Sequence, residues 1–170
     1  MESKQTIYYG EMQMNDWYFF VAATAKGLCY VSSQPLRTNG FHQWMNKHLP
    51  NANVEKNEMY MKPYMNQLME YVRGERKVYD LSLDLIGTTF QKAVWNALVE
   101  IPFGETTSYS AIAKKISKPQ AVRAISSAIG KNPILIVVPC HRVLRKNGEL
   151  SGFREGISMK RKLLELEKGM

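Results

Sequence analysis

Apolar and polar residues follow a strand-like pattern along the first part of the chain. Apolar runs over Thr6–Tyr9, Trp17–Ala22 and Leu28–Val31 are separated by the turn-forming pairs Asn15-Asp16 and Lys26-Gly27. We predict that these three runs are β-strands joined as a small antiparallel meander.

Two helical patterns follow the predicted meander. Phe41–Leu49 predicts a short helix, and Tyr60–Val72 predicts a longer one in which tyrosine, leucine and methionine recur at helical spacing. We interpret this broad apolar face as a surface that packs in the core rather than as a cofactor site. The helix ends at Gly74–Lys77, and alternation over Val78–Leu85 predicts a further strand. We place a domain boundary at about residue 85.

The pattern beyond residue 85 is mainly helical. Apolar residues on one face predict a helix over Thr88–Ile101 and a closing helix over Ile157–Lys168. Between them, Ile134–Val138 has the composition of a buried strand that ends at Pro139.

Two short helices in this second half have the pattern of a helix-turn-helix. Ser108 is a suitable N-cap for a helix within Thr106–Ile116, and Ser117–Pro119 forms a break. The second helix, Gln120–Ile129, carries Arg123 among small residues. Many helical hairpins do not bind DNA, so this pattern indicates a nucleic-acid partner only in combination with the charge.

The basic residues are concentrated in the second half of the chain. Residues 1–85 carry nine basic and nine acidic side chains, whereas residues 86–170 carry 14 and six, so the whole net charge of +8 belongs to the second half. Such a segment either presents an ordinary solvated basic face or binds a polyanion, whose phosphates it neutralises with release of counterions.

Composition excludes several classes of protein. The 170 residues are 45% hydrophobic and 22% charged, which is typical of a folded chain of one domain or two small ones and not of a disordered tail. No apolar run approaches the length of a membrane span, and we find no signal peptide. The two cysteines, Cys29 and Cys140, are too few for a disulfide scaffold, so we predict free thiols and a cytoplasmic protein.

The segment around Cys140 is the part of the sequence that points most directly to chemistry. His141 and Arg142 follow Cys140 directly, and both side chains favour a thiolate, which is the nucleophilic form of cysteine. A buried structural cysteine is the alternative for an arbitrary Cys-His pair. The wider sequence context favours a reactive cysteine.

The string Pro-Cys-His-Arg-Val at residues 139–143 follows Arg123 and Asn132 at a specific spacing and precedes Leu-Leu-Glu-Leu-Glu at residues 163–167. In these features the chain resembles the O6-methylguanine-DNA methyltransferases, over residues 76–170. The resemblance implies an α/β (α+β) N-terminal domain of ribonuclease H-like topology at residues 1–85. It also implies a mainly helical C-terminal DNA-binding and methyl-acceptor domain at residues 86–170, with the helix-turn-helix and the reactive-cysteine segment.

The resemblance also implies a role for individual residues. Cys140 accepts the alkyl group from O6 of a guanine flipped out of duplex DNA, and His141 takes the thiol proton through a water molecule. Glu167 orients the imidazole, as in other arrangements of nucleophile, base and orienting group. Asn132 braces the turn that presents Cys140, and Tyr109 donates a hydrogen bond to guanine N3. The product is a thioether, so we expect each molecule to react once; whether O4-methylthymine is also a substrate stays open.

Expected DNA contacts cluster on the helical hairpin. Arg123 fills the space left by the flipped nucleotide while the second helix lies in the minor groove, whose degenerate pattern suits a lesion found in any sequence. The other expected contacts are Tyr109, Ser110, Lys114, Lys115, Lys118, Ser127 and Lys131. The implied partner is double-stranded DNA containing O6-alkylguanine, bound by a monomer without a cofactor or a membrane.

The sequence departs from the family pattern beside the expected substrate pocket, to which we assign Val143, Phe153, Arg154 and Glu155. Many members read Gly-Tyr-x-Gly-Gly where this chain has Phe153 and Glu155 in the second and fourth places. Glu155 puts a bulky carboxylate where glycine is common, so we predict that O6-benzyl adducts react less readily than methyl adducts.

Two further questions concern metal and alternative functions. Some relatives bind zinc, but Cys29, His42 and His48 lack a fourth ligand and a paired ligand spacing, so we predict no metal. Three alternatives stay open: a non-repairing binder of alkylated DNA, a regulatory DNA-binding protein in which Cys140 is dispensable, and a cysteine hydrolase that turns over.

Overall fold

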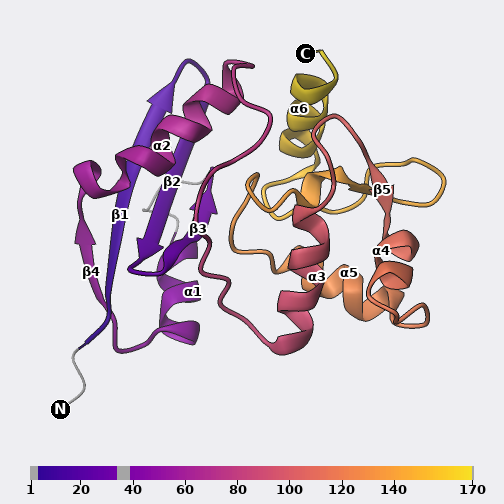
Figure 1. Ribbon diagram of the computed structural model, residues 1–170, viewed down its shortest axis with the longest axis horizontal. Helices are drawn as coiled ribbons and strands as arrows, with labels where there is room; N and C mark the ends of the chain where they lie inside the picture. The colour runs from indigo at the N-terminus through magenta and orange to yellow at the C-terminus, as the bar shows by residue number, and fades with distance from the viewer. Residues whose placement is uncertain (1–3, 34–38, 170) are drawn as a thin grey trace. The chain divides into compact units, whose positions relative to one another are not determined.

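The computed structural model describes residues 4–33 and 39–169. The chain divides into two compact units, residues 1–86 and 87–170 (Figure 1). No helix in the described residues is both long and apolar enough to cross a lipid bilayer.

The first unit is built on a four-stranded sheet with the order β3-β2-β1-β4. Strands β1 (Thr6–Met14), β2 (Trp17–Thr24) and β3 (Gly27–Ser32) pair antiparallel, which confirms the predicted meander. Strand β4 (Asn53–Lys56) pairs parallel to β1 and was not predicted. Its four residues are mostly polar and exposed, so they carry no apolar alternation that could have revealed the strand.

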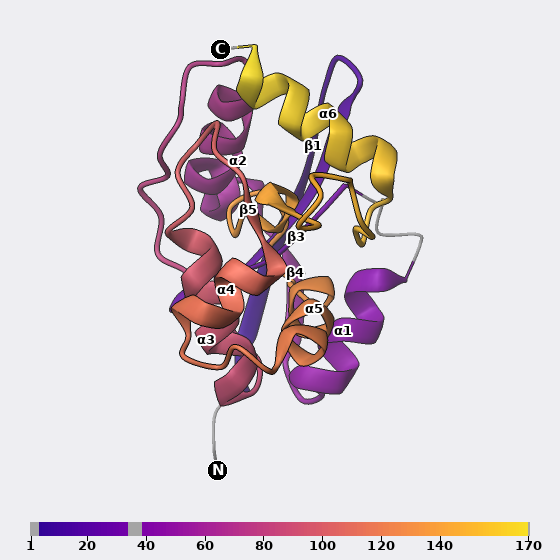
Figure 2. The same ribbon diagram turned by 90° about the vertical axis from the view of Figure 1, so that its right-hand side faces the viewer.

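Two helices cover opposite faces of this sheet. Helix α1 (Gly40–His48) places Phe41 in a core with Ile7 and Phe20, and helix α2 (Glu58–Val72) packs against the other face (Figure 2). Gly10 of β1 allows α2 to approach closely, because a Cβ there would lie 3.1 Å from the sulfur of Met65. The odd-numbered and even-numbered residues of β1 therefore face opposite sides of the sheet, as strand geometry requires.

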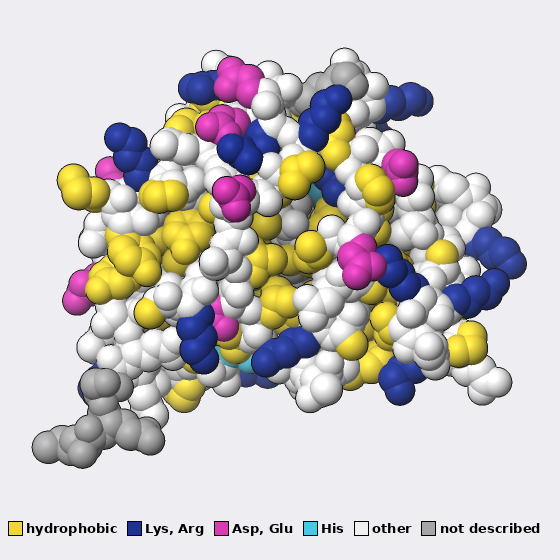
Figure 3. Space-filling model, in the orientation of Figure 1, with side chains coloured by type: hydrophobic (Ala, Val, Ile, Leu, Met, Phe, Trp, Pro, Cys, Tyr) yellow, Lys and Arg dark blue, Asp and Glu magenta, His cyan; other side chains and the backbone are white. Residues whose placement is uncertain are grey.

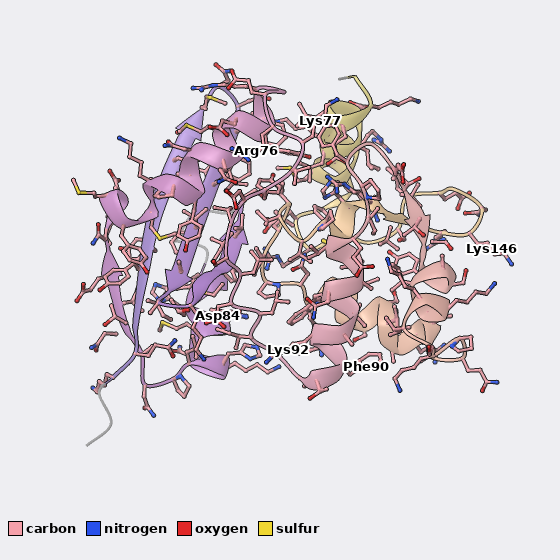
Figure 4. All side chains as sticks on the ribbon, viewed as in Figure 1. Arg76, Lys77, Asp84, Phe90, Lys92 and Lys146 are labelled. Atoms are coloured by element: carbon pink, nitrogen blue, oxygen red, sulfur yellow. The ribbon has the colours of Figure 1, made fainter. Side chains whose placement is uncertain are left out.

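The predicted strand over Val78–Leu85 is wrong. Only Leu83 forms a bridge, with Leu28 of β3, and the Gln67 side chain bonds both the N–H and the C=O of Asp80 at 2.9 and 3.0 Å. Asp84, labelled in Figure 4, accepts a hydrogen bond of 2.6 Å from Thr24 Oγ1. This extended segment is held by side chains and one bridge instead of a ladder, although its apolar alternation resembles that of a strand.

The second unit is mainly helical. It contains α3 (Thr89–Val99), β5 (Thr107–Ser108), α4 (Tyr109–Lys115), α5 (Val122–Gly130), a single 3-10 turn (Cys140–Arg142), β6 (Val143–Leu144) and α6 (Ile157–Lys168). The predicted N-cap is confirmed, since Ser108 Oγ accepts the N–H of Ala111 at 3.1 Å. Thr107, directly before this N-cap, pairs in parallel with Val143. This short pair joins the start of the helical hairpin to the end of the reactive-cysteine segment.

The predicted strand over Ile134–Val138 is also wrong. The run is buried, but it turns back on itself through hydrogen bonds from Val138 N to Ile134 O (3.0 Å) and from Val137 N to Leu135 O (2.8 Å). Ile136 has φ 72°, a left-handed conformation that is strained for a β-branched residue. An apolar run surrounded by core on all sides looks the same in sequence whether its backbone is extended or turned.

Candidate active site

Cys140 lies in the 3-10 turn directly after Pro139, with 5% of its surface exposed. The backbone forms this turn directly after Pro139, where we predicted that the preceding strand ends. Successive side chains on a 3-10 helix are rotated by about 120°, so Cys140 and His141 still point in different directions. The turn therefore buries the sulfur while directing the imidazole elsewhere.

Asn132 holds the buried loop that leads to Cys140. Its Nδ2 donates to Val138 O at 2.8 Å and its Oδ1 accepts the N–H of Ile134 at 2.9 Å, with only 2% of the residue exposed. The Asn132 side chain also bonds the sulfur of Cys140, which favours the thiolate. These contacts tie the two ends of the loop together directly before Cys140.

The Cys140 thiol is protonated at rest. Burial raises the pKa of Cys140, and the Asn132 hydrogen bond and the charges of Arg154 and Lys160 oppose that rise only in part. The guanidinium of Arg142, which we expected to favour the thiolate, is directed to Glu167 instead. A base must therefore remove the thiol proton before the sulfur can act as a nucleophile.

His141 and Glu167 meet in a buried contact. His141 Nε2 lies 2.6 Å from Glu167 Oε2, and both side chains are almost fully buried, at 0% and 2% exposed. Burial lowers the pKa of His141, which outweighs the opposing effect of the Glu167 carboxylate, so the imidazole is neutral at pH 7. Its other nitrogen, Nδ1, is buried and bonds none of the described residues. The site thus holds a neutral imidazole with one nitrogen engaged and one available.

A pocket of about 690 Å³ lies beside the helical hairpin. Tyr109, Arg123 and Ser126 line it together with Ser151 and Gly152. The phenol oxygen of Tyr109 bonds the hydroxyl of Ser151. The structure therefore brings Tyr109 and Arg123, predicted from widely spaced sequence positions, to one cavity.

Four residues that we assigned to a substrate pocket lie outside the walls of this cavity. Val143 is fully buried at 0% exposed. Arg154 Nη1 donates to Asn132 O at 3.0 Å, and Phe153 is partly buried. The Glu155 carboxylate lies 3.4 Å from Arg154 Nε with a side chain only 3% exposed. The carboxylate thus occupies interior space rather than open solvent.

The expected DNA contacts differ in how available they are. Lys114, Lys118, Lys131 and Ser127 are exposed on or beside α4 and α5, and Figure 3 shows basic side chains on the surface of this unit. Lys115 instead forms an ion pair with Glu100. Ser110 is partly buried, with its hydroxyl 3.1 Å from that of Ser108.

The described residues contain no group of three or more histidine, cysteine or acidic side chains that could hold a metal ion. Cys29, the most deeply buried of the three candidate ligands, bonds Ala22 O at 3.5 Å, and burial raises its pKa to about 12. Its thiol behaves as a core side chain.

Comparisons with known proteins agree with this geometry. Residues 7–85 match the ribonuclease-like domain of 6-O-methylguanine DNA methyltransferase, and residues 89–169 match the DNA-binding domain of the same family. The chain is 46% identical to the inducible methylated-DNA–protein-cysteine methyltransferase of Bacillus subtilis (strain 168), over 98% of this chain and 93% of that protein. The chain belongs to the 6-O-methylguanine DNA methyltransferase family. This result confirms both the resemblance and the predicted fold class.

Solved methyltransferases share the fold of this family member. The crystal structure of the Mycobacterium tuberculosis O6-methylguanine methyltransferase is 37% identical with a TM-score of 0.79, covering 96% of this chain and 93% of that one. A structure described as Mycobacterium tuberculosis OGT in complex with DNA is 36% identical with a TM-score of 0.80, covering 96% and 93% of the two chains.

Two buried cations of this methyltransferase were not predicted as site residues. The sequence places Arg142 beside the thiol but does not show that it pairs with Glu167. Lys160 is 1% exposed and donates to Val143 O at 2.7 Å and to Ser151 O at 3.4 Å. Lys160 lies seven residues before Glu167, which places both on one face of α6, and this spacing was the signal available in the sequence.

Proposed function

We propose that the protein repairs duplex DNA directly by moving the alkyl group from O6 of guanine to Sγ of Cys140. His141 Nδ1 takes the thiol proton through a water molecule. The sulfur then attacks the alkyl carbon, a C–S bond forms, the C–O6 bond breaks, and its electron pair stays with the guanine. The proton is returned to the guanine, so thioether and unmodified base are the products. The observation that carries this proposal is the buried Cys140 beside a neutral His141 whose Nδ1 has no described partner.

The same proposal assigns the helical hairpin to base flipping. Helix α5 enters the minor groove, and Arg123 takes the place of the extruded nucleotide. Tyr109 donates to guanine N3 as negative charge develops on the leaving base. Their shared cavity supports this assignment, since both residues line the same pocket. Lys118 and Lys131, both exposed, contact phosphates.

The proposed reaction consumes the protein. A thioether sulfur has no proton to lose, and the described residues of the site include no group that would remove the alkyl carbon. Each molecule therefore reacts once. A cysteine hydrolase would instead turn over, which separates the two functions by stoichiometry.

Intact-protein mass spectrometry after mixing with a duplex that contains one O6-methylguanine tests the proposal. We expect a gain of one methyl group per protein that maps to Cys140 and is absent in Cys140→Ser. Cys29→Ala is the matched control, because it removes the other cysteine and is expected to gain the methyl group normally. An unchanged mass together with salt-sensitive binding of the duplex would refute the proposal and favour a lesion sensor.

A further inference from the structure

The Glu167 carboxylate is surrounded by hydrogen-bond donors. Arg142 reaches it with two nitrogens, Nε at 2.8 Å from Oε1 and Nη2 at 3.1 Å from Oε2. The backbone N–H of Gly104 lies 3.4 Å from Oε1, and His141 Nε2 lies 2.6 Å from Oε2. Two donors therefore reach each oxygen, which matches the capacity of an ionised carboxylate.

Arg142 is itself held in place. Its Nη1 donates to Ile101 O at 2.6 Å, and its guanidinium carbon lies 5.7 Å from the centre of the Phe103 ring. The residue is 5% exposed, so its forked pairing with Glu167 is shielded from water. A bidentate arginine pair of this kind is strong and fixes geometry as well as charge.

These contacts determine which nitrogen of His141 carries the proton. An arginine cannot accept a hydrogen bond and does not lose its proton, so the carboxylate that it binds in two places stays ionised. An ionised carboxylate can only accept, so His141 Nε2 must be the donor. In a neutral imidazole the remaining nitrogen, Nδ1, then carries a lone pair.

We propose that Arg142 is a positioning residue that keeps Glu167 ionised and so holds His141 as the neutral Nε2–H tautomer, with Nδ1 as the base. The inference rests on the proposed function, because the tautomer matters only if His141 accepts the thiol proton during methyl transfer. Arg142 acts through Glu167 and does not contact the reacting atoms.

The charged groups around His141 act in two directions. Glu167 favours the imidazolium, whereas Arg142 and Lys160 disfavour it, and Cys140 is the neighbouring acid whose proton is transferred. Loss of the Arg142 charge removes a cation that disfavours a further proton on the coupled pair of His141 and Glu167. The pair then keeps that proton to higher pH, and the base is lost from a larger part of the pH range.

Single-turnover methyl transfer at saturating duplex, measured against pH, tests this role in Arg142→Gln and Arg142→Lys. We expect the acidic limb of the rate–pH profile to lie about one pH unit higher in Arg142→Gln. At pH values on that limb the variant then reacts ~tenfold more slowly than the wild type. Arg142→Lys keeps the charge without the fork and is expected to lie between Gln and wild type. Arg161→Gln is the matched control, because it removes an exposed positive charge from α6 and should not move the limb.

Nitrogen-15 NMR of the imidazoles in the wild-type protein provides a second measurement that does not depend on a variant folding. We expect His141 to carry its proton on Nε2, whereas a proton on Nδ1 would overturn the inference. An unmoved acidic limb in a folded Arg142→Gln would overturn it as well. In both cases methyl transfer by the wild type would leave the proposed function intact, whereas absence of transfer by the wild type would refute that function separately.

Discussion

Replacing Asn132 by alanine tests how the loop before Cys140 is held. The change removes the acceptor of Ile134 N and one of the donors to Val138 O, both buried. An unpaired buried backbone group costs about 1–3 kcal/mol, and Val138 O keeps its bond of 2.8 Å from Cys140 N, so its share is at the low end. The two losses together predict that the second unit is destabilised by about 2–4 kcal/mol.

Hydrogen exchange in the intact protein can measure this destabilisation separately for the second unit, residues 87–170. Protection of the α3 and α5 amides reports opening of residues 87–170, and a loss of about 2 kcal/mol raises their opening constant roughly 30-fold. Asn96→Ala is the control, because Asn96 is exposed on α3 and should change stability by less than ~0.5 kcal/mol. An Asn132→Ala variant that loses less than ~1 kcal/mol would show that the loop does not depend on these two bonds.

Three other perturbations have defined outcomes. Lys160→Met removes a buried cation that lowers the pKa of Cys140, so a titration of the thiolate absorbance should show a higher pKa, and an unchanged value would contradict the assigned charge effect. Gly27→Ala should destabilise the first unit by more than about 2 kcal/mol in thermal unfolding, because its Cβ would collide with the backbone of Ser82; a smaller loss would mean that this segment moves easily. Second-order rates should be roughly tenfold or more lower for O6-benzylguanine than for O6-methylguanine, since this chain has the bulky Glu155 where many family members have glycine, and equal rates would exclude that effect.

The sequence predicted best the elements whose apolar period was long and well bounded. Helix α6 has the predicted bounds, and Ser108 caps α4 as expected. The failures were the polar strand β4, whose pairing depends on β1, the extended segment at Val78–Leu85, and the turned run at Ile134–Val138. In these segments the backbone path is set by distant partners, which periodicity does not record.

The sequence named candidate site residues but not their electrostatics. The family resemblance pointed to Cys140, His141 and Glu167, and the structure brings His141 and Glu167 into contact. The protonated state of the thiol was not predictable, because it depends on burial within the folded unit. The partnership of Arg142 with Glu167 was likewise hidden, since 25 residues separate the two in sequence.

The burial of Cys140 also bears on how long an unused molecule stays competent. A protein proposed to react once has one acceptor sulfur, and any oxidant or electrophile that reached it would inactivate the molecule without a repair. With 5% of the residue exposed and its pKa raised, the sulfur is both shielded and in its less reactive form. Unreacted molecules are thereby protected from inactivation, and the sulfur reacts only with a base that is brought into direct contact with it.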